Sequence, residues 1–153
     1  MGHLCDIVDV DALRASTLVR HVELHDTLPS TNDRASELAG TPDVNTPALV
    51  VARLQTAGRG RGTNSWWSAD GALTFSLILD TDRWGITQCD WPRLSLATAV
   101  AVCDALTGVV PQSSLAIKWP NDVLLDGRKV AGILIESPGA TPQSKDRLVI
   151  GVG

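Results

Sequence analysis

The sequence predicts an α+β protein with a mixed β-sheet and helices packed on one side of it. Two observations support this fold class. Several short segments alternate apolar with polar residues, or run together as β-branched stretches, and turn residues separate them. Two or three other segments carry apolar residues at helical spacing. Hairpins mixed with helices in this way favour an α+β architecture.

The first third of the chain predicts a helix, a strand and a second helix. Val10–Val19 has apolar residues at helical spacing, and Asp9 stands where a cap would be. Val22–Leu28 alternates apolar and polar side chains, which predicts a strand. A turn of small polar residues then leads into a helix at Asp33–Ala39, which Gly40 ends.

The middle of the chain predicts two strands around a long loop, and then a helix. Ala48–Leu54 is a β-branched apolar run typical of a buried strand. Gln55–Gly71 is too long for a simple connection, and loops of this size are usually functional or disordered. Leu73–Leu79 alternates cleanly as a strand. Pro92–Leu106 starts with proline and stays apolar, which predicts a mostly buried helix ended by Gly108.

The last third predicts only strands. They lie at Leu115–Trp119, Val123–Leu125, Val130–Glu136 and Leu148–Val152. The dipeptide Asp126-Gly127 separates the second of these from the third and signals a tight hairpin.

The composition is that of one ordinary globular domain. Of the 153 residues, 44% are hydrophobic and 20% are charged, which suffices for a single core. The net charge of -4 excludes the global positive field that would hold nucleic acid. No apolar run approaches the ~18 residues that span a bilayer, and the N-terminus lacks the basic region of a signal peptide.

The cysteines indicate a reducing compartment. Cys5, Cys89 and Cys103 form no CxxC pair and are odd in number. We therefore expect neither a disulfide framework nor a zinc site, and a cytoplasmic location is the natural expectation.

The glycine–arginine segment (Gly58–Gly62, GRGRG) is the first candidate for chemistry. Glycines let a backbone approach a ligand closely, and guanidinium forks suit phosphate or carboxylate. The segment follows a buried strand whose end carries Gln55. This position favours a loop that closes on a bound anion, which we call an anion clamp. It matches neither a phosphate-binding P-loop nor a dinucleotide fingerprint. The alternative is a flexible, solvated loop or an RGG-like nucleic-acid segment.

The second candidate is the turn Lys118–Asp122 (KWPND). It combines a cation, a large aromatic ring, an amide and a carboxylate within five residues. Asn121 and Asp122 are hard oxygen ligands, suited to Mg²⁺ that is held partly by phosphates and water. The alternative is an ordinary turn with a surface ion pair, because turns favour these residue types.

The third candidate is Lys129, in a segment that continues through Gly132 to Glu136. The expected hairpin brings Lys129 close to Asp122. A lysine there could neutralise charge that builds on a phosphate during transfer, although an exposed hairpin lysine is the ordinary alternative. Gly132 inside an apolar strand suggests close approach by a ligand or a neighbouring side chain.

The fourth candidate is Ser30-Thr31-Asn32, which precedes the second helix. Helix capping is one role for these residues. A cap also directs the free N–H groups of a helix N-terminus at whatever lies in front of it. Hydroxyl and amide groups there could bind a polar head group such as a urea or a carboxylate.

Taken together and in this order, the four candidates resemble the catalytic domain of biotin protein ligases, also named biotin–[acetyl-CoA-carboxylase] ligases. The resemblance covers about Leu24 to Gly153, and the pairing of GRGR with KWPND favours biotin over the related lipoate ligases. It implies a mixed, largely antiparallel sheet like that of class II aminoacyl-tRNA synthetases. It also implies that biotin and Mg-ATP give biotinyl-5′-AMP and pyrophosphate. The biotinyl group would then pass to a lysine of a biotin carboxyl carrier protein.

The resemblance also assigns expected roles to residues. Lys129, Arg59 and Arg61 would be catalytic, with Lys129 contacting the biotin carboxylate and the α-phosphate. Asp122 and Asn121 would hold Mg²⁺. The residues expected to bind biotin or its adenylate are Ser30, Thr31, Asn32, Gln55, Gly58, Arg59, Gly60, Arg61, Trp66, Lys118, Asn121, Lys129, Gly132 and Ile133.

The chain departs from the family pattern in two respects. Thr63 stands where many members have a glycine, which should stiffen the loop, and the sequence stops at Gly153 where the family usually continues. We expect residues 1–20 to be an extension or a short helix, and residues 21–153 to be an incomplete catalytic domain. Neither an N-terminal winged helix nor a C-terminal β-domain is expected. A homodimer is left open.

Two other functions remain as alternatives. The same fold could bind biotin or its adenylate without turnover, and pyrophosphate release would separate that role from a ligase. Single-stranded nucleic acid could bind through Arg59, Arg61 and the tryptophans, but the acidic net charge argues against it.

Overall fold

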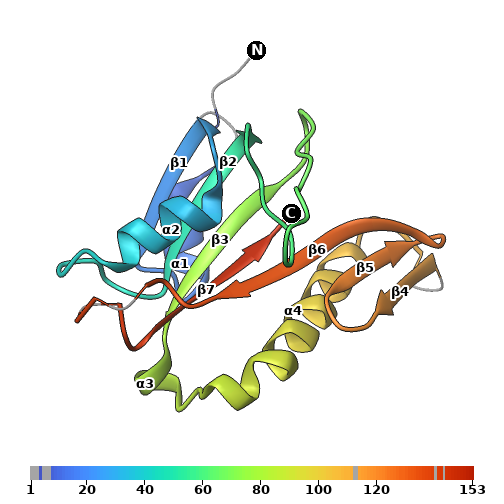
Figure 1. The fold of residues 1–153 in the computed structure, drawn as a ribbon. Coiled ribbons are helices and arrows are strands. Elements are labelled where there is room, and N and C mark those ends of the chain that lie inside the picture. The colour runs from blue at the N-terminus through green and yellow to red at the C-terminus, as the bar shows by residue number, and fades with distance from the viewer. Residues whose placement is uncertain (1–3, 5–7, 112–113, 140, 143) are drawn as a thin grey trace.

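The computed structural model describes residues 4, 8–111, 114–139, 141–142 and 144–153, so Cys5 lies outside the described residues. A single seven-stranded sheet runs through the molecule in the order β1-β2-β3-β7-β6-β5-β4 (Figure 1). The strands are β1 (His21–Leu28), β2 (Ala48–Gln55), β3 (Thr74–Asp80), β4 (Leu115–Lys118), β5 (Asp122–Leu125), β6 (Arg128–Glu136) and β7 (Arg147–Val152).

The pairing of the strands is mixed and mostly antiparallel. β1 and β2 are parallel, and each of the other neighbouring pairs is antiparallel. This confirms the α+β class and the mixed, largely antiparallel sheet. Every predicted strand is present, with bounds within two residues of those expected.

The predicted helices are also present. They are α1 (Val10–Ser16), α2 (Thr31–Ala39) and α4 (Trp91–Leu106). The expectation that the last of these is mostly buried is wrong: Ser95 and Ala99 are its buried residues, while Leu96 and Val100 are exposed, because one face of a helix that packs on a sheet stays open to solvent. Two short helical turns that the sequence analysis did not anticipate, α3 (Thr81–Trp84) and η2 (Gln88–Asp90), carry the chain from β3 into α4.

The expectation that the helices share one side of the sheet is wrong. Ala35 and Leu38 of α2 pack in one cluster with Val149 of β7. Ala99 of α4 packs in another cluster with Leu148 of β7. Successive residues of a strand point to opposite faces, so α2 and α4 cover opposite faces, as Figure 1 shows. The physical reason is that β7 is apolar on both faces, and each face needs its own cover.

The β5–β6 hairpin follows the turn chemistry that its sequence predicts. Asp126 and Gly127 have φ angles of 49° and 75°. Positive φ at both central residues is the geometry of a two-residue type I′ turn, whose twist matches that of the flanking strands. The hairpin thereby fixes the register that sets Lys129 beside β5.

Two further observations concern the rest of the described chain. Cys89 and Cys103 are free thiols. Within the described residues, no helix combines the length and the apolar content that crossing a membrane requires.

Candidate functional site

A cavity of about 650 Å³ opens on the face of the sheet that carries α2. This volume lies within the usual range for small-molecule sites. Thirteen of the predicted site residues line it: Ser30, Thr31, Asn32, Gln55, Arg59, Gly60, Arg61, Trp66, Asn121, Asp122, Lys129, Gly132 and Ile133. The four candidate segments therefore meet at one place, although they are far apart in the sequence.

Two predicted residues lie elsewhere. Lys118 is exposed at the end of β4, the edge strand of the sheet, and it is not among the lining residues. Gly58 is buried and is also not among the lining residues. A Cβ at Gly58 would stand 2.6 Å from the Trp66 carbonyl oxygen and 2.9 Å from Gln55 Nε2, so only glycine fits there.

The floor of the cavity consists largely of glycine. Gly132 of β6 exchanges backbone hydrogen bonds with Gly153, and Gly151 lies opposite Leu134 in the same pair of strands. The Trp66 indole covers this floor. A Cβ at Gly132 would lie 3.0 Å from Trp66 Cζ3, and one at Gly153 would lie 2.5 Å from its Nε1. The close approach predicted at Gly132 is confirmed, and the neighbours are Trp66 and Lys129.

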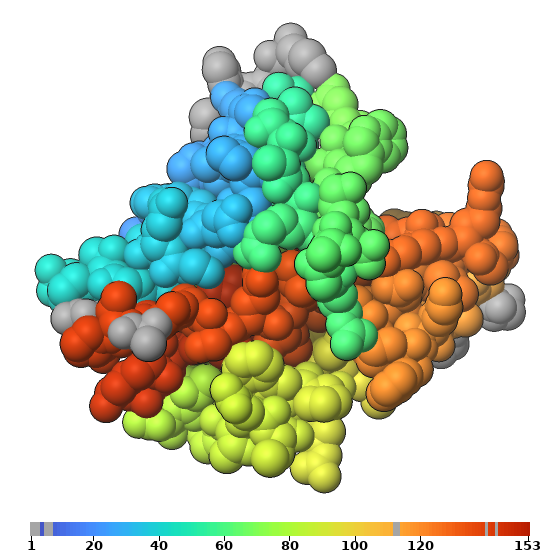
Figure 2. All heavy atoms as spheres, in the orientation of Figure 1, coloured from blue at the N-terminus to red at the C-terminus, as the bar shows by residue number. Residues whose placement is uncertain are grey.

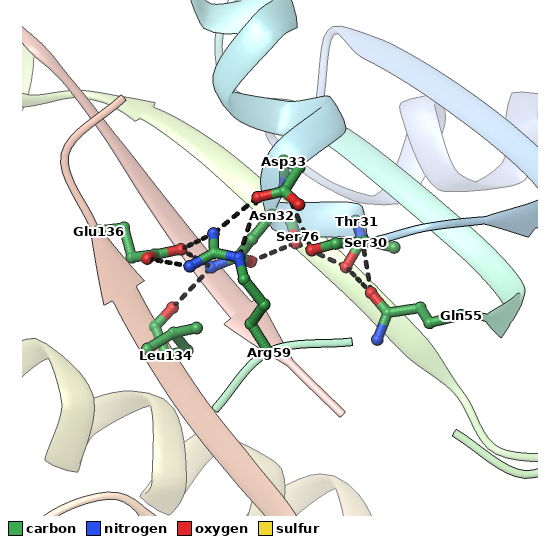
Figure 3. Close-up of polar contacts among 9 residues, drawn as sticks. All are labelled: Ser30, Thr31, Asn32, Asp33, Gln55, Arg59, Ser76, Leu134 and Glu136. Atoms are coloured by element: carbon green, nitrogen blue, oxygen red, sulfur yellow. Dashed lines mark hydrogen bonds and ion pairs between the residues drawn. The ribbon is translucent and has the colours of Figure 1, made fainter. Parts of the chain in front are cut away.

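The wall beside α2 is a connected polar network (Figure 3). Ser30 caps the helix by accepting a hydrogen bond from the Asp33 N–H at 3.3 Å, which confirms the predicted cap. The backbone N–H and the hydroxyl of Thr31 both donate to Gln55 Oε1, at 2.6 and 3.0 Å. Ser76 of β3 donates to Asn32 Oδ1 at 2.6 Å and lies 2.8 Å from Thr31 Oγ1. Buried hydroxyl and amide groups are thus held in fixed orientations at the cavity edge.

Arg59 joins two carboxylates from different elements, as Figure 3 shows. Its Nη1 and Nη2 donate to the two oxygens of Glu136, each at 2.7 Å. Its Nε donates to Asp33 Oδ1 at 3.0 Å, and Nη2 lies 2.8 Å from the same oxygen. All three guanidinium nitrogens therefore face carboxylate oxygen. We call Arg59, Asp33 and Glu136 the Arg59 cluster.

The charges of this cluster are mutually stabilised. Burial alone raises the pKa of Glu136, but hydrogen bonds from Arg59 and Asn32 lower it more, so the pKa lies below its ordinary value. Asn32 Nδ2 supplies one of these bonds at 2.8 Å. The Glu136 hydrogen bonds, followed by those of Asp33, hold the pKa of Arg59 above its ordinary value. Arg59 and Glu136 therefore both stay charged near neutral pH.

The opposite wall carries a second ion pair. Lys129 Nζ lies 2.8 Å from Asp122 Oδ1 and 5.1 Å from the centre of the Trp66 ring, in a cation–π contact. The expected proximity of Lys129 and Asp122 is confirmed. The ammonium is thus aimed at the cavity by a carboxylate on one side and an aromatic face on the other.

Asn121 holds the KWPND turn against β6. Its carbonyl oxygen accepts from the Ile133 N–H at 2.9 Å, and its Nδ2 donates to the Ile133 carbonyl oxygen at 3.0 Å. These two bonds continue the strand pairing past the start of β5, and the Asn121 Oδ1 atom takes no part in them. The turn is therefore fixed in position at the cavity.

The glycine–arginine segment folds as a small hairpin. The Trp66 N–H donates to the Gly58 carbonyl at 2.8 Å, and the Gly60 N–H donates to the Asn64 carbonyl at 2.8 Å. Arg61 lies near the tip and is exposed. In Figure 2 the green residues of this loop reach down the front face to the red and orange residues of the C-terminal strands.

A second hollow of about 410 Å³ adjoins the first. Trp91 and Trp119 line it, together with the start of α4, and it shares Arg61 and Asn121 with the main cavity. The side chain of Trp119 is 73% exposed. The two hollows also share Ile133 and Leu134, so they lie side by side.

Sequence reasoning missed several residues of the site. Asp33, Ser76, Gly151 and Gly153 were given no role, and Glu136 was named as the end of the Lys129 segment but given no role of its own. Ser76 and Gly151 stand inside apolar strand patterns, where a small or polar residue is the available signal. Nothing in the local sequence pairs Arg59 with Glu136, because 77 residues separate them.

The comparisons with known proteins agree with this geometry. The profile of the biotin/lipoate A/B protein ligase family matches residues 24–153. A biotin–[acetyl-CoA-carboxylase] ligase of Paracoccus denitrificans is 42% identical over 125 residues, which cover 81% of this chain and 50% of that protein. The bifunctional ligase/repressor BirA of Bacillus subtilis is 39% identical over 146 residues, which cover 92% of this chain and 42% of that protein.

Two solved structures share the fold. The biotin protein ligase of Leishmania major in complex with biotinyl-5-AMP superposes with a TM-score of 0.72, at 28% identity, over 87% of this chain and 56% of that one. The biotin protein ligase of Aquifex aeolicus in complex with biotin and ATP gives a TM-score of 0.69 at 31% identity, over 87% of this chain and 51% of that one.

The chain spans about half of the length of the curated relatives named above. Within that span, the family profile covers most of β1, the other six strands, α2, α4 and every segment that meets at the cavity. The chain belongs to the biotin/lipoate A/B protein ligase family.

Proposed function

We propose that this protein is a biotin–protein ligase, which activates biotin as biotinyl-5′-AMP and transfers it to a lysine of a biotin carboxyl carrier protein. One observation carries the proposal: the glycine–arginine hairpin, Lys129 and Asp122 line the same cavity as the polar wall of α2. The Paracoccus relative is a biotin–[acetyl-CoA-carboxylase] ligase, and the two similar solved structures are biotin protein ligases that hold biotinyl-5-AMP, or biotin and ATP.

The proposed chemistry needs cations at the cavity. A carboxylate and the α-phosphate of ATP are both anions, so their approach must be compensated by positive charge placed in advance. Lys129 is placed by Asp122 and Trp66, and Arg61 lines both hollows. We assign Lys129 to the biotin carboxylate and the α-phosphate, and Arg61 to the adenylate.

The uncharged end of biotin would meet the polar wall. Its ureido ring is a neutral group with both donors and acceptors. Thr31, Asn32 and Gln55 supply amide and hydroxyl groups that are already oriented by one another, and Trp66 supplies an aromatic face over the glycine floor. A planar polar ring and an alkyl chain fit such a combination.

The residues present fit a Mg²⁺ ion held mainly by phosphates. Among the residues that the structure describes, no group of three or more His, Cys, Asp or Glu could hold a metal. Asp122 offers one carboxylate and Asn121 one amide oxygen, which matches the habit of Mg²⁺ to take one or two protein ligands plus phosphates and water. When bound, Mg²⁺ would supply charge neutralisation at the phosphates.

Two assays test the proposal. Titration calorimetry should detect biotin binding to the folded protein, and lipoate should bind more weakly. A pyrophosphate-release assay should show turnover that depends on both biotin and ATP. Absence of biotin binding would refute the proposal. Binding without pyrophosphate release would identify a binding module of the same fold instead.

A further inference from the structure

Arg59 takes an unexpected position for a residue of an anion clamp. Each nitrogen of its guanidinium faces a carboxylate of this chain. A guanidinium that is bonded on all its nitrogens to two acids has little capacity left for the anion of a ligand. In this arrangement Arg61, at the tip of the hairpin, is the arginine that remains open toward both hollows.

The Arg59 cluster connects three elements that belong to different parts of the fold. Arg59 lies on the glycine–arginine hairpin, Asp33 in the first turn of α2, and Glu136 at the end of β6. Glu136 also accepts from Asn32, a cavity residue. The side chain of Glu136 is 26% exposed, against 41% for Arg59 and 50% for Asp33, so it is the most sheltered member and the only one that pairs end-on with Arg59.

We propose that Glu136 is a positioning residue, which acts through Arg59 to hold the glycine–arginine hairpin over the cavity and so retains the ligand there. The identity of the ligand rests on the proposed function. The closure of the hairpin by Glu136 and Arg59 does not depend on it. The two arginines then have different roles: Arg59 fixes the hairpin to the rest of the fold, and Arg61 faces the ligand.

The geometry explains why a bidentate pair serves this purpose. Two parallel N–H···O bonds fix the direction of the hairpin as well as its distance from the sheet. The neutral isostere glutamine would present an N–H₂ group to one guanidinium nitrogen and lose one of these bonds. The pair also neutralises a carboxylate that would otherwise repel an anionic ligand at the cavity edge.

Limited proteolysis of the ligand-free protein tests the closure directly. Trypsin cleaves after Arg61, at the exposed tip of the hairpin, and intact-mass analysis identifies the cut. Glu136→Gln should raise the rate of this cleavage about tenfold, as expected for the loss of a charge-assisted hydrogen bond. Asp70→Asn is the matched control. It removes the 2.8 Å ion pair with Arg53 at the base of the same loop and should leave the rate unchanged.

A double-mutant cycle tests whether Glu136 acts through Arg59. We expect Glu136→Gln and Arg59→Lys each to speed the release of bound biotinyl-adenylate about tenfold, and R59K/E136Q to be no faster than either. Glu136→Asp should restore part of the retention, because it keeps the charge. If the two effects multiply, Glu136 acts through Asn32 instead and the proposal fails.

The remaining outcomes are equally decisive. An unchanged tryptic rate in Glu136→Gln overturns the closure, whatever the ligand does. An increased tryptic rate in a protein that binds no biotin supports the closure by Glu136 and refutes the proposed function. The two inferences can therefore fail separately.

Discussion

Lys129 shows how much of the site depends on a single side chain. It is half-exposed, yet Asp122 and Trp66 hold its ammonium group in one place. In the proposed reaction, negative charge develops beside Lys129. A fixed charge there contributes more to rate than a mobile charge in solvent, because no reorganisation is needed during the reaction.

Replacement of Lys129 should therefore abolish most activity while the fold survives. Lys129→Ala is expected to lower biotin-dependent pyrophosphate release by about 100-fold or more, with little change in the midpoint of denaturant unfolding. Lys145→Ala is a suitable control, since Lys145 is 69% exposed beside Asp146 and should retain full activity. Wild-type rates in Lys129→Ala would remove Lys129 from the reaction.

At Gly151, by contrast, the structure of the site depends on the absence of a side chain. A Cβ at this position would collide with Oδ1 of Asn32, and Asn32 is held by Ser76 and Glu136. The amide cannot move without breaking these bonds. The position thus links strand β7 to the polar wall.

We expect Gly151→Ala to destabilise the protein by about 2 kcal/mol, in the range for overpacking a tight interior. Urea denaturation measures this. Gly108→Ala provides the comparison, because nothing lies within 4 Å of a Cβ there, and its free energy of unfolding should change little. Equal stability of the two variants would contradict the packing argument.

At the scale of elements, an ion-pair group fastens α2 to the edge strand β1. Arg34 of α2 donates to both oxygens of Glu23 in β1, at 2.8 and 2.9 Å. His25 Nε2 lies 3.1 Å from the same carboxylate. The hydrogen bonds from Arg34 are the main reason that the pKa of Glu23 falls to about 2, against an ordinary value of 4.5.

A lowered pKa makes this contribution depend on pH with a definite sign. It is fully present above the unfolded pKa of about 4.5 and is lost as the pH falls towards 2. Glu23→Gln should cost about 2 kcal/mol at pH 6, allowing for solvent screening. Denaturation at several pH values should show the gap to wild type closing between pH 4.5 and 2. A gap that stays constant with pH would mean that charge is not its cause.

At the scale of the whole molecule, the cavity draws on nearly every part of the sheet. α2 and β2 supply one wall, β6 and β7 the floor, and the KWPND turn the other wall. A ligand that contacts all of them stabilises the folded state by mass action. Two substrates that react to form one tightly bound adenylate should stabilise the folded state by more than the sum of their separate effects.

Thermal unfolding should show this effect. Biotin and ATP together are expected to raise the Tm by more than the sum of their separate shifts. A non-hydrolysable ATP analogue that cannot release pyrophosphate is the control, and with it the shifts should simply add. Additive shifts with ATP itself would argue that no adenylate forms.

Local sequence predicted the elements well and their arrangement poorly. Asp126-Gly127 predicted the hairpin because turn geometry demands positive φ at those positions. The insertion of β7 between β3 and β6 has no local signal, since Leu148–Val152 is apolar on both faces and could pair with any strand. The placement of α2 and α4 on opposite faces was missed for the same reason.

The site was predictable where motifs carry chemistry and not where contacts cross the fold. GRGR and KWPND named Arg59, Arg61, Asn121 and Asp122, and the structure gathers them. The partners of Arg59 were not predictable, because ion pairing between distant segments depends on the finished fold. Lys118 shows the converse: it belongs to a motif, yet its strand leaves it at the edge of the sheet.

The position of β7 also has a consequence for the order of folding. β1–β3 and β4–β6 are adjacent within each group, and β7, made after both, is the strand that joins the two groups into one sheet. During synthesis on the ribosome, the Gln55 half and the Lys129 half of the cavity can each form strands, but the sheet is not continuous between them until residues 147–152 emerge. A nascent chain halted before that point would contain the residues of both cavity walls but would lack the β7 part of the cavity floor.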